Sequence, residues 1–181
     1  MLFRRSHAIG IKIAALLIFS LTTAGSSEAI ELDWQNLLET GERCSGLSRE
    51  IILSVMWIES RGNPNAININ GVGGFSPVSA EEALRILYRY NRPNVDIGLM
   101  QVNWKTWGPL YGLRAADLLD PATNICLGSR ILRDYIDDHR GSWRGVGRYN
   151  AVTYSKQLSY ATQVNRTYKR IKAMHPVKAA Q

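Results

Sequence analysis

The chain has 181 residues, 45% of them hydrophobic and 20% charged, an ordinary globular composition with enough apolar material for one buried core. Its formal charge of +7 suits polyanionic partners in general, among them nucleic acid, acidic lipid and the bacterial wall. A nucleic-acid-binding protein is disfavoured, because the sequence has no clustered run of Lys and Arg, no zinc-type Cys/His spacing and no RNA-binding signature.

The first 29 residues follow the pattern of a cleavable export signal. Basic residues precede an apolar run over 13–21, and small residues follow as far as Ala29. The run is well short of the roughly 20 residues that a membrane-spanning helix needs. We therefore predict a signal peptide over 1–29, a mature chain in the periplasm and no stable membrane span after cleavage. An uncleaved anchor is the alternative.

Beyond the signal, the apolar pattern and the capping residues favour helices. Helices are predicted over residues 34–40, 79–90, 115–118, 124–139 and 154–173. A further helix is predicted to begin at residue 48 and to end at Gly62 and Pro64. The Asn- and Gly-rich stretch 67–74 predicts a loop or a short hairpin. No segment shows sustained period-two alternation. The expected architecture is one mainly α domain over 30–175, followed by a short tail over 176–181.

Two cysteines, Cys44 and Cys126, lie in the part of the chain that we expect to leave the reducing cytoplasm. Paired thiols usually oxidise outside the cytoplasm, which predicts a disulfide between them. Two buried free thiols are the alternative. A cysteine nucleophile is disfavoured, because neither residue lies near a histidine motif. No cofactor or metal is expected, and none of the three histidines is placed like a catalytic residue.

Glu59 is the anomalous residue of its predicted helix. It lies three or four positions after Val55 and Met56, so its carboxyl group continues an apolar stripe. Loss of water and the negative C-terminal end of the helix both favour the protonated form. A glutamate in such an environment serves as a general acid near neutral pH, as in lysozyme. The alternative is a solvated residue in the last turn.

The residues around and after Glu59 form an ordered set. The set comprises Glu59-Ser60, Asn63-Pro64, Ala66, Gly98-Leu99-Met100-Gln101, Leu119-Asp120-Pro121, Asn124, Gly128 and Tyr149-Asn150-Ala151. In content and order it resembles the soluble lytic transglycosylase family, over about residues 44 to 168. The resemblance implies a lysozyme-like fold, of the type shared with goose-type lysozymes, with a sugar-binding groove.

The resemblance also implies a reaction. Glu59 matches the family's catalytic glutamate, which protonates the glycosidic oxygen between N-acetylmuramic acid and N-acetylglucosamine. The same residue then deprotonates the muramic acid O6, which closes a 1,6-anhydro ring. No water attacks, so a second carboxylate is not required. The implied substrate is the peptidoglycan glycan strand. Small exported relatives commonly open the wall for secretion, conjugation or pilus machines, so components of such machines are expected partners of a monomeric enzyme.

Substrate contacts follow from the same match. They are implied for Gln101, Tyr149, Asn150, Asn68, Met100 and Asn103. The phenol of Tyr149 either holds the Glu59 carboxyl group or binds the substrate acetamido group. Met100 either contacts substrate or only packs the loop. Trp104 and Trp107 either stack on sugar rings or belong to the core.

Asn103 separates this chain from goose-type lysozymes, which have Asp at that position. Asp96 is the nearest remaining carboxylate and either positions a water or caps the loop. A hydrolytic muramidase is therefore the alternative enzyme, and a non-catalytic wall-binding subunit is the alternative from another class. Residues 69–95 look like an insertion, which forms a flap over the groove or contacts a partner.

Overall fold

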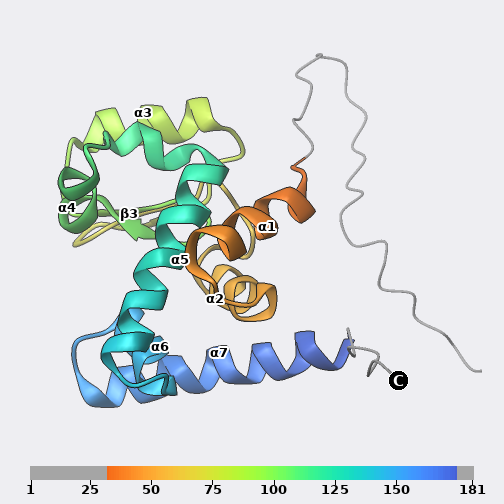
Figure 1. Cartoon of the computed structure of the whole chain (residues 1–181). Helices are drawn as coiled ribbons and strands as arrows, with labels where there is room; N and C mark the ends of the chain where they lie inside the picture. The colour runs from red at the N-terminus through yellow and green to blue at the C-terminus, as the bar shows by residue number, and fades with distance from the viewer. Residues whose placement is uncertain (1–31, 175–181) are drawn as a thin grey trace, which may run out of the picture. The chain divides into compact units, whose positions relative to one another are not determined.

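The structure is a computed structural model that describes residues 32–174 (Figure 1). The predicted signal peptide and the predicted tail lie outside these residues. In chain order the elements are α1 (Trp34–Ser45), α2 (Arg49–Ser60), β1 (Ile67–Ile69), β2 (Gly73–Phe75), α3 (Ala80–Tyr90), β3 (Val95–Ile97), β4 (Val102–Asn103), α4 (Trp104–Trp107), the 3-10 turns η1 (Pro109–Tyr111) and η2 (Ala115–Leu119), α5 (Pro121–Asp138), α6 (Trp143–Asn150) and α7 (Tyr154–Met174). The mainly helical expectation is confirmed. Within 32–174, no helix has both the length and the apolar character for crossing a membrane.

Short polar side chains begin several of these helices. The Asp33 carboxylate accepts a hydrogen bond from the Asn36 amide at the start of α1, and Asp120 does the same for Thr123 at the start of α5. At α3, Ser79 Oγ accepts from the Glu82 amide as predicted. The Glu82 carboxylate reaches back to the amide of Val78, one residue before the expected partner of a capping box.

Helix α5 runs through the centre of the molecule and contacts both α1 and α6, while α2 packs on α7 (Figure 1). The core contains fully buried side chains from α2, the sheet, the 98–101 loop and α5, including Ile52, Ile97, Leu99 and Leu132. Burying each such side chain contributes about 1.5–3 kcal/mol. The core therefore joins α2, the sheet and α5, and the candidate site lies among these elements.

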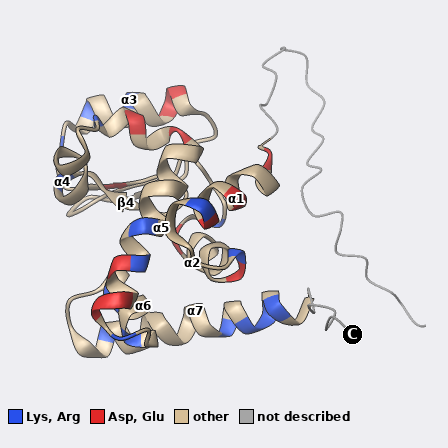
Figure 2. Cartoon of the chain, viewed as in Figure 1, with Lys and Arg blue, Asp and Glu red and all other residues tan. Residues whose placement is uncertain are grey.

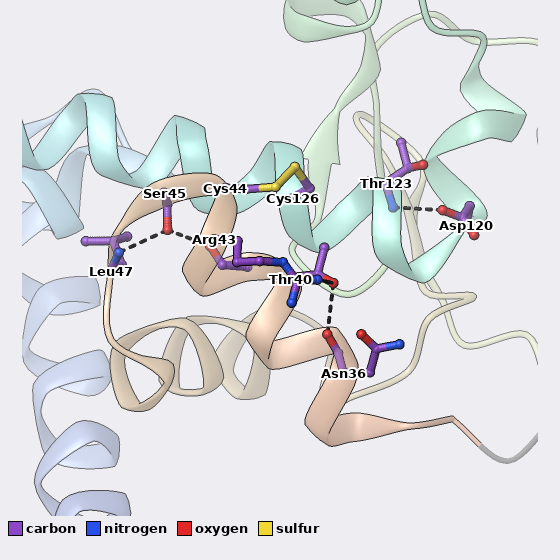
Figure 3. Close-up of a disulfide and its surroundings, with 10 residues drawn as sticks. Asn36, Thr40, Arg43, Cys44, Ser45, Leu47, Asp120, Thr123 and Cys126 are labelled. Carbon is purple, nitrogen blue, oxygen red and sulfur yellow. Dashed lines mark hydrogen bonds between the residues drawn. A yellow bond between two sulfur atoms is a disulfide. The ribbon is translucent and has the colours of Figure 1, made fainter.

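The predicted disulfide is confirmed. Cys44, at the end of α1, is bonded to Cys126 in the first turns of α5 (Figure 3), with 5.3 Å between their Cα atoms and 82 positions between them in sequence. Among residues 32–174 there is no free cysteine. The bond links the first helix of the domain to the central one.

The sheet is more extensive than the sequence predicted. Its four strands are antiparallel in the order β2-β1-β3-β4. A loop or a short hairpin was expected at 67–74, and the structure has the hairpin. Strands β3 and β4 were not expected, because strands of two or three residues are too short to show an alternating pattern. Residues 69–95 include β2 and α3, and α3 packs on η2 and buries Ala83.

Helix α6 was also missed. Its eight residues include Gly145 and Gly147, and glycine is a poor helix former that weakens a sequence signal. Both glycines are buried against backbone. A Cβ atom at Gly147 would lie 2.4 Å from the Gln157 carbonyl oxygen, and one at Gly145 would lie equally close to that of Tyr135. The close approach of α6 to α5 and α7 therefore requires residues that the local pattern disfavours.

Candidate active site

A cleft of about 540 Å³ opens between the end of α2, the sheet, the middle of α5 and the junction of α6 and α7. Six of the predicted site residues line it together: Glu59, Asn68, Gln101, Asn103, Tyr149 and Asn150. Asn70 and Asn94, at the two ends of the 69–95 segment, also line it, whereas no residue of α3 does. The structure therefore does not support a flap formed by α3, and contact of the 69–95 segment with a partner stays a prediction.

Glu59 lies in the last turn of α2, after the buried residues Val55 and Met56. Its side chain is partly buried and faces the cleft, so it continues the apolar stripe as predicted. The next residue fixes this end of the helix, because Ser60 Oγ donates a hydrogen bond of 2.8 Å to the Leu99 carbonyl oxygen. The position of the carboxyl group is thereby tied to the 98–101 loop.

The surroundings of Glu59 bring its pKa into the neutral range. Burial is the largest influence and raises the pKa from 4.5 to about 7. The Tyr160 phenol donates a hydrogen bond to Glu59 Oε1 and lowers the pKa, the negative charge of Asp96 raises it, and the Asn150 amide lowers it. At neutral pH the carboxyl group can therefore give a proton and take one back.

Asp96 forms the centre of a polar row across the sheet. In the strand register it lies directly between Asn68 of β1 and Asn103 of β4. Asp96 Oδ2 accepts from the side-chain amides of Asn68 at 2.9 Å and Asn70 at 3.0 Å, and Oδ1 accepts from that of Asn103 at 2.7 Å. It is thus a strand residue facing the cleft, which corrects the expectation of a loop cap. Asn103 caps α4 instead, by accepting from the Thr106 amide.

The 98–101 loop is held by the buried side chain of Asn124. Asn124 Oδ1 accepts from the Met100 amide at 2.8 Å, and Nδ2 donates to the carbonyl oxygens of Ile97 at 2.7 Å and Leu118 at 2.9 Å. Gly98 has a φ of 78°, in the left-handed region that favours glycine. A Cβ atom there would also lie 2.3 Å from Asn124 Nδ2. Both features explain the glycine that begins this motif.

Gln101 and Met100 are placed differently by this loop. Gln101 lines the cleft, and its Nε2 donates to the carbonyl oxygens of Ala66 at 3.0 Å and Gly98 at 2.9 Å. Its two amide hydrogens are thus used within the protein, which leaves its oxygen to accept from a ligand. Met100 is fully buried and does not line the cleft. Contact of its side chain with substrate is therefore not supported, because it packs against Gly128 in the core.

Tyr149 does not hold the Glu59 carboxyl group, which corrects one of the two roles considered for it. Tyr149 Oη donates a hydrogen bond of 2.7 Å to the Met100 carbonyl oxygen, and the phenol that holds Glu59 belongs to Tyr160. Sequence reasoning missed Tyr160. The available signal was the helical stripe of buried residues that includes Gln157, Tyr160 and Val164 on α7, because a buried phenol needs a hydrogen-bond partner.

The two tryptophans also differ. Trp104 packs against the core, and its indole N–H donates to the Leu113 carbonyl oxygen. Trp107 lines the cleft and meets the Tyr135 ring edge-on, with 6.3 Å between ring centroids. Within residues 32–174, no three His, Cys, Asp or Glu side chains gather as a metal site.

Comparison with known proteins gives a consistent set of matches. The family described as "Transglycosylase SLT domain" matches residues 37–171. "X polypeptide" of Escherichia coli is 31% identical over 133 residues, which cover 68% of this chain and 67% of that protein. "Endo-type membrane-bound lytic murein transglycosylase A" of Enterobacter sp. (strain 638) is 25% identical over 71% of this chain and 54% of its own length. "Type IV secretion system protein virB1" of Brucella abortus is 34% identical over 47% and 37%, respectively. No solved structure gives a significant match.

Proposed function

Because the chain belongs to the transglycosylase SLT family and is a peptidoglycan lytic transglycosylase of lysozyme-like fold, we propose that Glu59 is its single catalytic acid and base. The observation that carries this proposal is the environment of the carboxyl group. It faces a cleft, burial raises its pKa to about 7, and a phenol donates to it. Acid and base catalysis by one group is most effective when its pKa is near the working pH.

The proposed reaction has two proton transfers. Protonated Glu59 donates its proton to the glycosidic oxygen as the bond from that oxygen to C1 of N-acetylmuramic acid breaks, and N-acetylglucosamine leaves with a free hydroxyl. The resulting carboxylate takes the proton of the muramic acid O6 hydroxyl while O6 bonds to C1. The 1,6-anhydro ring closes and Glu59 is again protonated. Tethered O6 is favoured over a free water, because its attack loses less orientational entropy.

Substrate binding is assigned to the polar residues around Glu59. Asn150 is exposed beside the carboxyl group, and the Gln101 oxygen is available as an acceptor. Asn68 and Asn103 line the opposite wall, where their amide groups also hold Asp96. We expect these groups to bind sugar hydroxyl and N-acetyl groups, and the Tyr149 phenol to position the loop through the Met100 carbonyl.

Hydrolysis is the second candidate, and the position of Asp96 favours it. This carboxylate faces the same cleft as Glu59 and raises its pKa, as a second acidic group of a hydrolase would. Three of its four acceptor sites are already taken by amide hydrogen bonds, however, which leaves one site on Oδ1 for a water, whereas attack by the tethered O6 needs no second carboxylate. The transglycosylase reaction is therefore preferred.

Mass analysis of the muropeptides released from purified peptidoglycan tests the proposal. We expect products ending in 1,6-anhydromuramic acid, lighter by one water than lysozyme products. Reducing ends carrying oxygen-18 from labelled water would replace this reaction by hydrolysis. Glu59→Gln should abolish release while strand binding persists, because the amide keeps the shape but transfers no proton. Glu81→Gln, at an exposed site on α3, is the matched control.

We also propose that the enzyme acts in the periplasm and opens the wall locally for a secretion, conjugation or pilus machine. The similarity to a type IV secretion system protein supports this role, and the predicted export signal supports the location. Deleting the gene should lower secretion or transfer in its host. Restoration by the wild type but not by Glu59→Gln would tie that role to strand cleavage, and equal restoration by both would refute it.

A further inference from the structure

Among the described residues that line the cleft, Arg148 is the one with a cationic side chain. Basic residues elsewhere gather on exposed surfaces, such as the C-terminal half of α7 (Figure 2). We propose that Arg148 binds a carboxylate on the muramyl substituent of the substrate and so makes the enzyme selective for charged strands. This inference rests on the proposed function, since it concerns the same substrate.

The side chain is placed as a rigid anion-binding group. Arg148 lies in α6 next to Tyr149 and is partly buried. Its guanidinium carbon is 5.6 Å from the centroid of the Tyr135 ring, which in turn packs against Trp107. Nη1 donates to the Ala151 carbonyl oxygen at 3.2 Å. A guanidinium group has five N–H donors, so this bond leaves most of them for a ligand.

No carboxylate of the described residues pairs with Arg148. The four ion pairs within 32–174 all involve other arginines. The cleft's own carboxylates are engaged elsewhere, Glu59 by Tyr160 and Asp96 by three amides. The influences on the pKa of Glu59 are burial, Tyr160, Asp96 and Asn150. We therefore treat the role of Arg148 as separate from proton transfer.

The substrate supplies a suitable partner on every second sugar. Muramic acid carries a lactyl group, whose carboxyl is free in peptide-free strands and amide-linked where a stem peptide is attached, and the stem then brings carboxylates of its own. N-acetylglucosamine has none. A guanidinium group held beside an aromatic ring can match the planar geometry of a carboxylate through two parallel N–H donors. Arg148 thus distinguishes muramyl strands from neutral chitin-like ones.

Four substrates test this assignment: peptide-free strands and stem-bearing strands, each with free carboxylates or with those carboxylates converted to methylamides. We expect Arg148→Gln to lower kcat/KM about tenfold on the charged strands, through KM, as for loss of a hydrogen bond to a charged group. On the methylamides it should change kcat/KM less than twofold. Loss confined to peptide-free strands identifies the lactyl carboxylate, and loss confined to stem-bearing strands identifies the stem.

Two further variants separate selectivity from a structural role. Arg148→Lys should keep part of the preference for charged strands, whereas Arg144→Gln, on the outer face of the same helix, should leave all four rates unchanged. An equal loss on charged and neutral strands, or none on either, would overturn the proposal. Binding of the four strands to Glu59→Gln, with and without Arg148→Gln, measures the contribution of Arg148 without any turnover. This result does not depend on whether the products are anhydro sugars, so the Arg148 proposal and the proposed reaction can fail independently.

Discussion

Replacing Glu59 by Gln is expected to make the protein more stable in alkaline solution, although it removes the proposed catalytic group. The carboxyl group has a pKa of about 7 in the folded protein and an ordinary value of 4.5. The folded state therefore holds the proton more tightly than the unfolded chain. This contribution to stability is fully present below pH 4.5 and is lost as the pH rises through about 7. At about 1.36 kcal/mol per pKa unit, the loss amounts to about 3 kcal/mol.

Urea unfolding of both proteins between pH 4 and pH 8.5, with the disulfide intact, measures this effect. Glutamine does not titrate, so the difference in unfolding free energy should move by about 3 kcal/mol in favour of Glu59→Gln across that range. The buried phenols of Tyr149 and Tyr160 do not interfere, because burial raises their pKa values well above 10. Parallel pH curves for the two proteins would refute a buried, neutral Glu59. Glu81→Gln should show no such pH-dependent difference.

Three other predictions concern the supports of the site. Tyr160→Phe removes a hydrogen-bond donor that lowers the pKa of Glu59. The pH at which kcat/KM falls on the alkaline side should therefore rise by about one pH unit. An unchanged pH profile would argue against the contact between Tyr160 and Glu59. Replacing Cys44 and Cys126 together by Ala should lower the unfolding free energy by about 4 kcal/mol in the chain-entropy model, measured by urea unfolding beside a reduced wild type. Gly98→Ala should cost roughly 2 kcal/mol or more of stability and most of the activity, because its Cβ would meet Asn124 and its φ is positive. Gly74→Ala, where the new Cβ meets nothing within 4 Å, is its control in the same thermal melts and turnover assays.

The features predicted from sequence are those with a local signal or a residue-by-residue match. Glu59 is visible as a carboxyl group on an apolar stripe, and the hairpin at 67–74 is visible as Asn and Gly between periodic segments. The match to the family added Gln101, Tyr149 and Asn150, which all line the cleft. Capping residues placed the start of α3 correctly.

The missed features depend on contacts between distant segments. Tyr160 reaches Glu59 across 101 positions, and nothing near either residue indicates the pairing. The row of Asn68, Asp96 and Asn103 requires the register of three strands that are too short to be recognised singly. The match to the family left open whether Met100 contacts substrate or only packs the loop, and the sequence of the loop does not decide between the two. Only the packing against Gly128 shows which side is the core.

The three hydrogen bonds of Asn124 suggest which residue is best suited for recognising distant relatives of this fold. One side chain supplies an acceptor to the Met100 amide and two donors to carbonyl oxygens from separate segments. Aspartate would lack the donors and leucine would lack all three groups, so no residue of similar size substitutes for it. We therefore expect a descendant that has given up catalysis to tolerate loss of Glu59 more readily than loss of Asn124. On that expectation, this buried amide is a better marker of distant, inactive relatives than the proposed catalytic glutamate.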